Sequence, residues 1–217
     1  MAQTLPPFQE FLESIRETSN VQPLVNTLSL LFEPSAVLVN HLAPQLAISY
    51  RGSSDSKEVP KNYANVVDQA LDLVHNWEWS RKAEFVGGHP RIGEVKGLSA
   101  MSAAEQGQSP GISAGGPKPT PPEVLKRLEH LNAVFERRYP RLVYITFVNG
   151  RTRAQIKDEM EERLFAEGVL DTKDGIVDLD KVQPHDTDGD VWRDEVTRAV
   201  NDVGNIARNR LEKLAIA

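Results

Sequence analysis

Apolar residues recur at helical spacing along most of the chain, and this periodicity limits the fold more than any other feature of the sequence. Stripes with intervals of three and four residues run over 8–15, 24–31, 63–77 and 192–214, as expected of helices that bury one face. Only Leu142–Val148, rich in β-branched and aromatic residues, is typical of a buried extended segment. One such segment cannot alternate with helices to build a parallel sheet. We therefore predict an all-α fold over residues 1–217: a single-domain bundle of about seven or eight helices with one short extended segment.

Local signals predict where several helices begin. Ser35, which follows a proline, is a predicted N-cap. Thr120–Glu123 and Thr152–Gln155 have the pattern of capping boxes, in which a hydroxyl and a side chain three residues later satisfy exposed backbone amides. Each of these signals also fixes where the preceding loop must end.

Other segments are predicted to interrupt the helices. Phe85–Gly93 holds three glycines and a proline, so it is not expected inside a helix. Leu98–Gln106 is predicted to form a short helix. The Gly-, Pro- and Ser-rich residues 107–122 and the Asp-rich residues 168–190 are predicted loops.

Composition excludes several classes of protein. Cysteine is absent, so the chain has no disulfide framework, cysteine nucleophile or thiolate metal site. The net charge of −6 gives no basic excess of the kind that nucleic-acid binders show. No window is long and apolar enough for a bilayer, no signal peptide is evident, and the C-terminus does not read Ser-Lys-Leu. We predict a soluble cytoplasmic protein without nucleic-acid or membrane partners, with a peroxisomal location as the alternative.

Two short motifs match functional patterns without the context that those functions need. Gly111–Gly115 has the spacing of a nucleophile elbow, which requires a strand before it and a helix after it. Asp186–Asp190 begins like a calcium loop, but Val191 and Thr197 stand where a glycine and a glutamate are required. The five histidines show no metal-ligand spacing. We therefore predict no metal site.

His89 is the first candidate for chemistry. The following Pro90 holds it in an extended conformation, and Gly87 and Gly88 allow tight bends and close approach to a ligand. A histidine in such a loop between packed helices is well placed as a general acid or base. The alternative is a turn that happens to contain a histidine.

Arg210 is the second candidate. It lies on or beside the apolar stripe of the last helix, between Ala207 and Leu214. A guanidinium that points inward needs a partner, because an unpaired buried charge is costly. That partner is either a carboxylate of the protein or an anionic group of a ligand.

Ser102, Glu105 and Gln106 form the third candidate. On a helix, residues three and four apart share one face, so these side chains would present a hydroxyl, a carboxylate and an amide together. A short polar helix at the surface explains the same spacing.

Taken in order along the chain, these residues and several others resemble the 2-oxo-4-hydroxy-4-carboxy-5-ureidoimidazoline (OHCU) decarboxylase family. The two central elements are His89-Pro90-Arg91-Ile92 and Ser102-Ala-Ala-Glu105-Gln106. The supporting elements are Phe32-Glu33-Pro34-Ser35, Leu131-Asn132-Ala133 with Arg138-Tyr139, Val148–Thr152 with Ile156 and Arg163-Leu164, and Ile206–Leu211. The ordered set covers most of residues 8–215.

The resemblance implies a single OHCU decarboxylase-like domain that acts on a small-molecule substrate. It implies the loss of carbon dioxide from OHCU to give (S)-allantoin in urate degradation, with no metal and no organic cofactor. It assigns His89 as the acid/base and Glu105 as its partner. Pro90, Ser102, Gln106 and Arg210 become substrate contacts, and a homodimer is one oligomeric state that the sequence allows.

The chain also departs from the family pattern. Arg91 replaces an acidic residue common after the His-Pro pair, residues 107–122 lack the usual Ala-Gly-Leu, and the loop at 168–190 is longer than in compact members. These departures suggest a divergent branch, such as a fungal one. Two alternatives stay open: an inactive helical ligand-binding or scaffold homologue, and a lyase for a related ureido acid.

Overall fold

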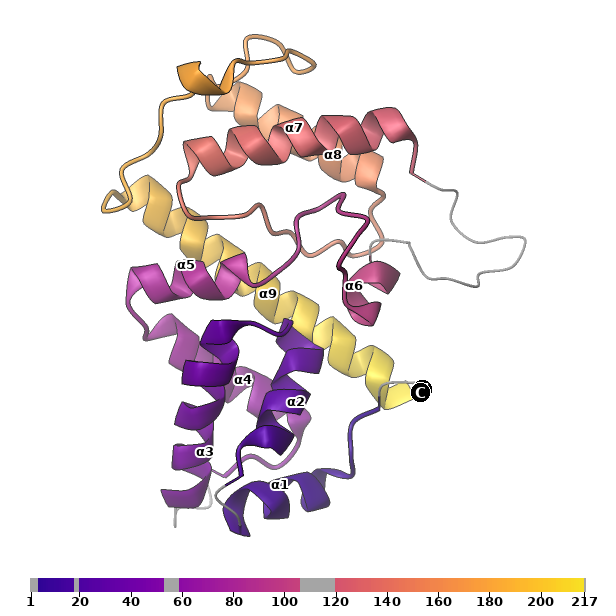
Figure 1. Cartoon of the computed structure of the whole chain (residues 1–217), viewed down its shortest axis with the longest axis vertical. Coiled ribbons are helices and arrows are strands. Elements are labelled where there is room, and N and C mark those ends of the chain that lie inside the picture. Colours follow the sequence, from indigo (N-terminus) through magenta and orange to yellow (C-terminus); the bar gives the residue numbers. More distant parts are fainter. Residues whose placement is uncertain (1–3, 18–19, 53–58, 106–119, 217) are drawn as a thin grey trace, which may run out of the picture. The chain divides into compact units, whose positions relative to one another are not determined.

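The structure is a computed structural model that describes residues 4–17, 20–52, 59–105 and 120–216 (Figure 1). These residues form nine α-helices and no strand, which confirms the all-α prediction. The helices are α1 (Phe8–Glu17), α2 (Gln22–Phe32), α3 (Ala43–Gly52), α4 (Tyr63–His75), α5 (Trp79–Gly87), α6 (Ala100–Glu105), α7 (Pro122–Arg138), α8 (Arg153–Ala166) and α9 (Asp190–Ile216), with a π-helical turn η1 (Leu38–Leu42) and a 3-10 turn η2 (Leu179–Lys181).

The chain divides into two compact units. The first unit comprises Met1–Gly88 and Val200–Ala217, and the second comprises His89–Ala199. Helix α9 contributes its first ten residues to the second unit and the remainder to the first. Among the described residues, every helix is too short or too polar to cross a bilayer.

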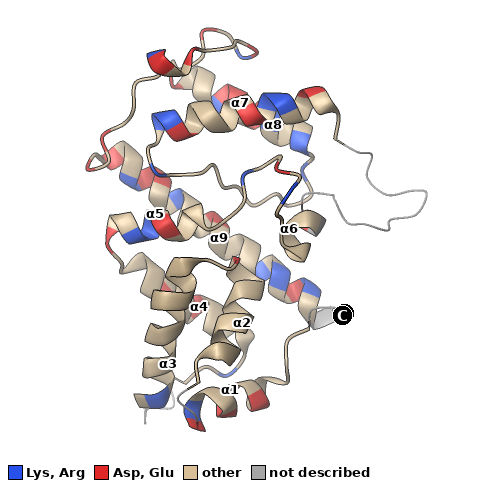
Figure 2. Ribbon diagram, viewed as in Figure 1, with Lys and Arg blue, Asp and Glu red and all other residues tan. Residues whose placement is uncertain are grey.

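Apolar packing between helices builds the first unit. α1 packs on α2 and α3, and the predicted stripe of Leu24, Leu28 and Leu31 is fully buried. α2 carries no charged residue, as its wholly tan ribbon in Figure 2 shows. Burial of the stripe accounts for the helical periodicity from which it was predicted.

The helix predicted after Ser35 forms, with an irregularity that the sequence did not reveal. The Ser35 hydroxyl accepts a hydrogen bond from the Leu38 amide at 3.3 Å, which confirms the predicted cap. The helix then widens into the π turn η1 and continues as α3. Pro44 explains the widening, because proline has no amide to donate and its ring crowds the carbonyl four residues earlier.

The prediction that Phe85–Gly93 lies outside a helix is wrong at its start. α5 continues through Phe85 to Gly87, and Gly88 is its C-cap. The Phe85 ring is buried 5.7 Å from that of Phe32 and 6.1 Å from that of Trp77, so packing holds the last turn in place. Gly87 and Gly88 are tolerated here because they stand at the end of the helix, where glycine is common.

The second unit is built around the pair α7 and α8, which pack on each other. The capping box predicted at Thr152–Gln155 is confirmed, with both reciprocal hydrogen bonds present. The box predicted at Thr120–Glu123 is wrong: Pro121 is the N-cap, and no side chain caps the helix. The helix begins one residue later than expected, because Pro122 at the first helical position lacks an amide and is already set to helical dihedrals.

Long segments of the second unit lie outside helices. Residues 142–148 form neither helix nor strand, and Leu142, Tyr144 and Ile145 are buried. Arg198 on α9 donates to the Ile145 carbonyl at 2.8 Å. The predicted loop at 168–190 contains only the short turn η2, and α9 begins at its last residue. The predicted loop at 107–122 lies outside the described residues up to 119.

Candidate functional site

His89 lies near the start of an irregular segment, residues 88–99, that connects α5 to α6. It follows the C-cap Gly88 directly, and its side chain is only 6% exposed. The histidine therefore lies in a loop, as predicted. The structure adds that this loop directly follows a helix end and that the side chain is buried. Pro90 beside it is half-buried.

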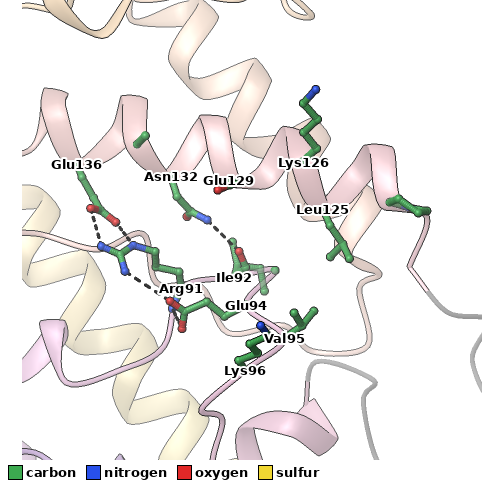
Figure 3. Close-up of a pocket in the computed structure, with 13 residues that line it drawn as sticks. Arg91, Ile92, Glu94, Val95, Lys96, Leu125, Lys126, Glu129, Asn132 and Glu136 are labelled. Carbon is green, nitrogen blue, oxygen red and sulfur yellow. Dashed lines mark hydrogen bonds and ion pairs between the residues drawn. The ribbon is translucent and has the colours of Figure 1, made fainter.

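Two buried side chains fasten this segment to the helices of the second unit. Asn132 on α7 donates from Nδ2 to the Ile92 carbonyl at 2.9 Å, as Figure 3 shows. Arg153 at the start of α8 donates from Nη2 to the Glu94 carbonyl at 3.0 Å. Backbone carbonyls outside a helix or sheet need such partners, because a buried carbonyl without one is costly.

Arg91 provides a third, more exposed attachment. Its guanidinium forms two hydrogen bonds with the Glu136 carboxylate on α7, one of them 2.8 Å from Nη2 to Oε2 (Figure 3). These hydrogen bonds raise the pKa of Arg91 above its ordinary value. The Arg91 amide also donates to Glu94 Oε2 at 3.2 Å. The basic Arg91 is thus matched by an acidic residue on the facing helix.

Gly93 allows the segment to lie close against α7. Its φ is +90°, and a Cβ atom there would lie 3.0 Å from Leu128 Cδ1 and 3.1 Å from Leu128 Cβ. Both the left-handed backbone and the close approach favour glycine at this position.

A cleft of about 800 Å³ lies between residues 91–96 and α7. Its described lining includes Lys96, Leu125, Lys126 and Asn132 (Figure 3), and it does not include His89, Ser102 or Glu105. The cleft therefore adjoins the segment that carries His89 without including that histidine.

Helix α6 carries two further predicted site residues. Ser102 is 3% exposed and Glu105 is half-buried, one helical turn apart. Ser99 immediately precedes the helix, and its hydroxyl accepts a hydrogen bond from the Ser102 amide at 3.1 Å. Burial of Ser102 argues against a purely polar surface helix. Gln106 lies outside the described residues.

Arg210 belongs to the first unit, so its surroundings are those of that unit. The side chain is 1% exposed, which confirms the predicted inward position. Its Nη2 lies 2.6 Å from Glu33 Oε1, and Nη1 donates to the Leu31 carbonyl at 3.4 Å. Of the two partners left open by the sequence, the structure shows a protein carboxylate.

Sequence reasoning gave no role to Glu33, Asn132 or Arg153. Glu33 is 5% exposed and has a φ of 79°, which is rare for a residue with a side chain. Asn132 stands four residues after Leu128 on a buried helix face, where an asparagine needs a partner. The position of a polar residue on an apolar stripe was therefore the sequence signal that could have identified Asn132 as a residue with a specific partner.

The described residues contain no group of three or more His, Asp or Glu side chains placed to hold a metal ion. Within the acidic segment at 186–190, the Asp188 side chain is 91% exposed. This exposure is consistent with an acidic loop at the surface.

A model of the family described as OHCU decarboxylase matches residues 18–183, more than half of the chain. The chain belongs to the OHCU decarboxylase family. The family consists of cofactor-independent carboxy-lyases of urate degradation, and its small-molecule chemistry leads to allantoin. A search of curated proteins found no match. The residues matched to the OHCU decarboxylase model include His89, Ser102, Glu105 and Glu33, whereas Arg210 lies beyond them.

Proposed function

We propose that this protein decarboxylates OHCU to (S)-allantoin, with His89 as the acid/base. The observation that carries the proposal is the family match over residues 18–183, which contains His89 at the start of a segment fastened to two helices. A rigid backbone around a catalytic group supports catalysis, because reactive groups must be held in a narrow range of positions.

The chemistry requires one well-placed acid. Loss of carbon dioxide breaks the bond between a ring carbon and its carboxylate and leaves the electron pair on that carbon, where the ring system delocalises it. Protonated His89 then delivers a proton to one face of the carbon, which sets the (S) configuration, and is left neutral. Solvent returns the proton to the histidine. A histidine side chain can both give up and regain a proton in this way.

The remaining roles follow the family resemblance. Glu105 is proposed to favour the protonated form of His89, since a nearby carboxylate stabilises an imidazolium. Pro90, Ser102, Gln106 and Arg210 are proposed to contact the substrate. Contacts to atoms that remain in allantoin would stabilise charge that develops in the transition state. Contacts to the departing carboxylate alone would stabilise the ground state instead.

The decisive experiment supplies freshly generated OHCU and follows (S)-allantoin by circular dichroism. His89→Ala and His89→Asn should lower turnover about a hundredfold or more. His75→Ala, which changes an exposed histidine on α4, should turn over like the wild type. Equal rates for wild type and His89→Ala, both above the spontaneous background, would refute the role of His89. If the wild type does not exceed that background, an inactive homologue or a lyase for another ureido acid becomes the better assignment.

Arg210 can be tested separately from His89. One guanidinium nitrogen already contacts Glu33, so a substrate contact has to share the other donors of the fork or exchange with Glu33. Arg210→Lys keeps the charge and loses the fork, and should raise KM while the fold is preserved. An unchanged KM in a folded Arg210→Lys protein would leave Arg210 with a structural role.

Independence from metals gives a further check. Activity should survive exhaustive EDTA treatment, because the proposed acid is a side chain. Loss of activity with EDTA and recovery with a divalent ion would contradict the proposal.

The finer predictions from sequence belong to the same proposal. We propose that residues 1–217 act as one functional domain in the cytoplasm, and that the chain represents a divergent, fungal-like branch of the family. A single domain should lose activity and helical circular dichroism in one coincident transition. Sedimentation would report whether a homodimer forms.

A further inference from the structure

We infer that Asn132 is a positioning residue for His89, an inference that rests on the proposed function. The hydrogen bond from Asn132 Nδ2 to the Ile92 carbonyl fixes the backbone three residues after the histidine. Asn132 does so from α7, whose other buried residues are apolar.

The orientation of the Asn132 amide follows from its partner. A carbonyl oxygen only accepts hydrogen bonds, so the group that faces Ile92 must be the amide nitrogen. Asn132 is 4% exposed, and no donor among the described residues reaches its Oδ1. Leucine would fill the same space without a buried polar oxygen, so packing alone does not explain an asparagine here.

Asn132 also differs from Arg91 and Arg153, which attach the same segment, in combining burial with a contact close to His89. The Arg91 side chain is 46% exposed and that of Glu136 is 27% exposed, so solvent weakens their ion pair. Arg153 is buried, but it holds Glu94, two residues further from His89 than Ile92. Gly93 lets the backbone approach α7 closely, and Asn132 supplies the buried polar contact at the same place.

The test compares Asn132→Leu with a matched change on the same helix. Arg127 on α7 donates to the Lys173 and Gly175 carbonyls at 2.9 and 2.8 Å, and so fastens a different loop, while its Nε pairs with Glu161 at 2.6 Å. Asn132→Leu should lower kcat about 10- to 100-fold and change KM less than about threefold. Arg127→Gln should leave both constants within about twofold of the wild type.

A double-variant cycle separates positioning from general damage. If Asn132 acts through His89, the variant Asn132→Leu/His89→Ala should turn over as His89→Ala does, within about twofold. Losses that multiply in the double variant would overturn the inference, as would wild-type kcat in a folded Asn132→Leu protein. Asn132→Gln, which keeps the donor, should recover part of the lost kcat.

Hydrogen exchange provides a readout that does not depend on turnover. Asn132→Leu should speed amide exchange across residues 88–96 about tenfold and leave residues 172–178 unchanged. Arg127→Gln should do the reverse. Unchanged exchange at 88–96 would overturn the inference. Failure of the proposed function would instead appear in the wild type, or in a fully active His89→Ala, before any Asn132 variant is measured.

Discussion

The backbone is stabilised in different ways in the two units of this protein. In the first unit, helices such as α2 bury apolar stripes against one another, and their backbone groups pair within the helix up to the last turn, where Arg210 donates to the Leu31 carbonyl. In the second unit, side chains of α7, α8 and α9 donate to carbonyls of segments outside the helices, at Ile92, Glu94, Ile145, Lys173, Gly175 and Gln183. Figure 2 shows the corresponding difference, with charged residues along α7 and α8 and almost none on α2 and α3.

This difference follows from where the backbone hydrogen bonds are made. A helix pairs its own amides and carbonyls, so only its apolar face has to find a partner. A segment outside helices has to find a donor for each buried carbonyl, and arginine offers five. The first unit should therefore be sensitive to volume and buried charge, and the second to the loss of individual donors and carboxylates.

The largest effect is expected from the buried charges of the first unit. Glu33→Gln leaves Arg210 buried at 1% exposure without its carboxylate and should lower the free energy of unfolding by about 3–5 kcal/mol. Glu33→Gln/Arg210→Met should recover much of that loss, because no charge remains buried. Urea denaturation measures both. A loss below about 1 kcal/mol in Glu33→Gln would show that this pair adds little to an apolar unit.

The carboxylate network of the second unit comes next. Glu195 is 4% exposed and contacts Arg163 at 2.8 Å and Arg198 at 2.6 Å. Glu195→Gln should lower the free energy of unfolding by about 2–4 kcal/mol. Glu162→Gln removes an exposed partner of Lys173 and serves as the control, with a change within about 0.5 kcal/mol. Equal effects of the two changes would contradict the importance of buried carboxylates in this unit.

Backbone position gives a smaller effect and relates directly to the site. Gly93→Ala places a methyl group against Leu128 at a φ of +90°, and should destabilise the protein by about 1–3 kcal/mol and lower kcat. Gly168 has a φ of +69°, and a Cβ atom there would meet nothing within 4 Å. Gly168→Ala should therefore lower the free energy of unfolding by about 1 kcal/mol without a change in kcat. Thermal unfolding and the OHCU assay distinguish the two. An unaffected kcat in Gly93→Ala would show that the segment tolerates displacement.

The smallest effect is a pH dependence of the second unit. Burial lowers the pKa of His130 and of His185, assisted by the charges of Arg127 and Arg138 respectively. The unfolded chain therefore binds protons more readily than the folded one, and the folded state loses stability as the pH falls below the ordinary histidine pKa of about 6.5. Urea denaturation at pH 7.5 and 5.5 should show a loss that His130→Asn and His185→Asn reduce. A pH dependence identical in these variants would assign it to other groups.

Several features of this molecule were determined by the sequence alone because they depend on neighbours along the chain. The stripe of Leu24, Leu28 and Leu31, the capping box at Thr152 and the inward position of Arg210 all follow from the repeat of a helix. His89 was placed in a loop by the glycines and the proline around it. These are local effects, and the spacing of a few residues suffices to predict them.

Only the tertiary structure decided which distant residues meet. The Arg210 guanidinium pairs with Glu33, 177 residues away in the sequence, and Asn132 donates to the Ile92 carbonyl, 40 residues away. Helical spacing says that a face is buried but not what covers it, because the partner is selected by the packing of whole helices. The N-cap at Pro121 was likewise missed, since adjacent prolines allow more than one helix start.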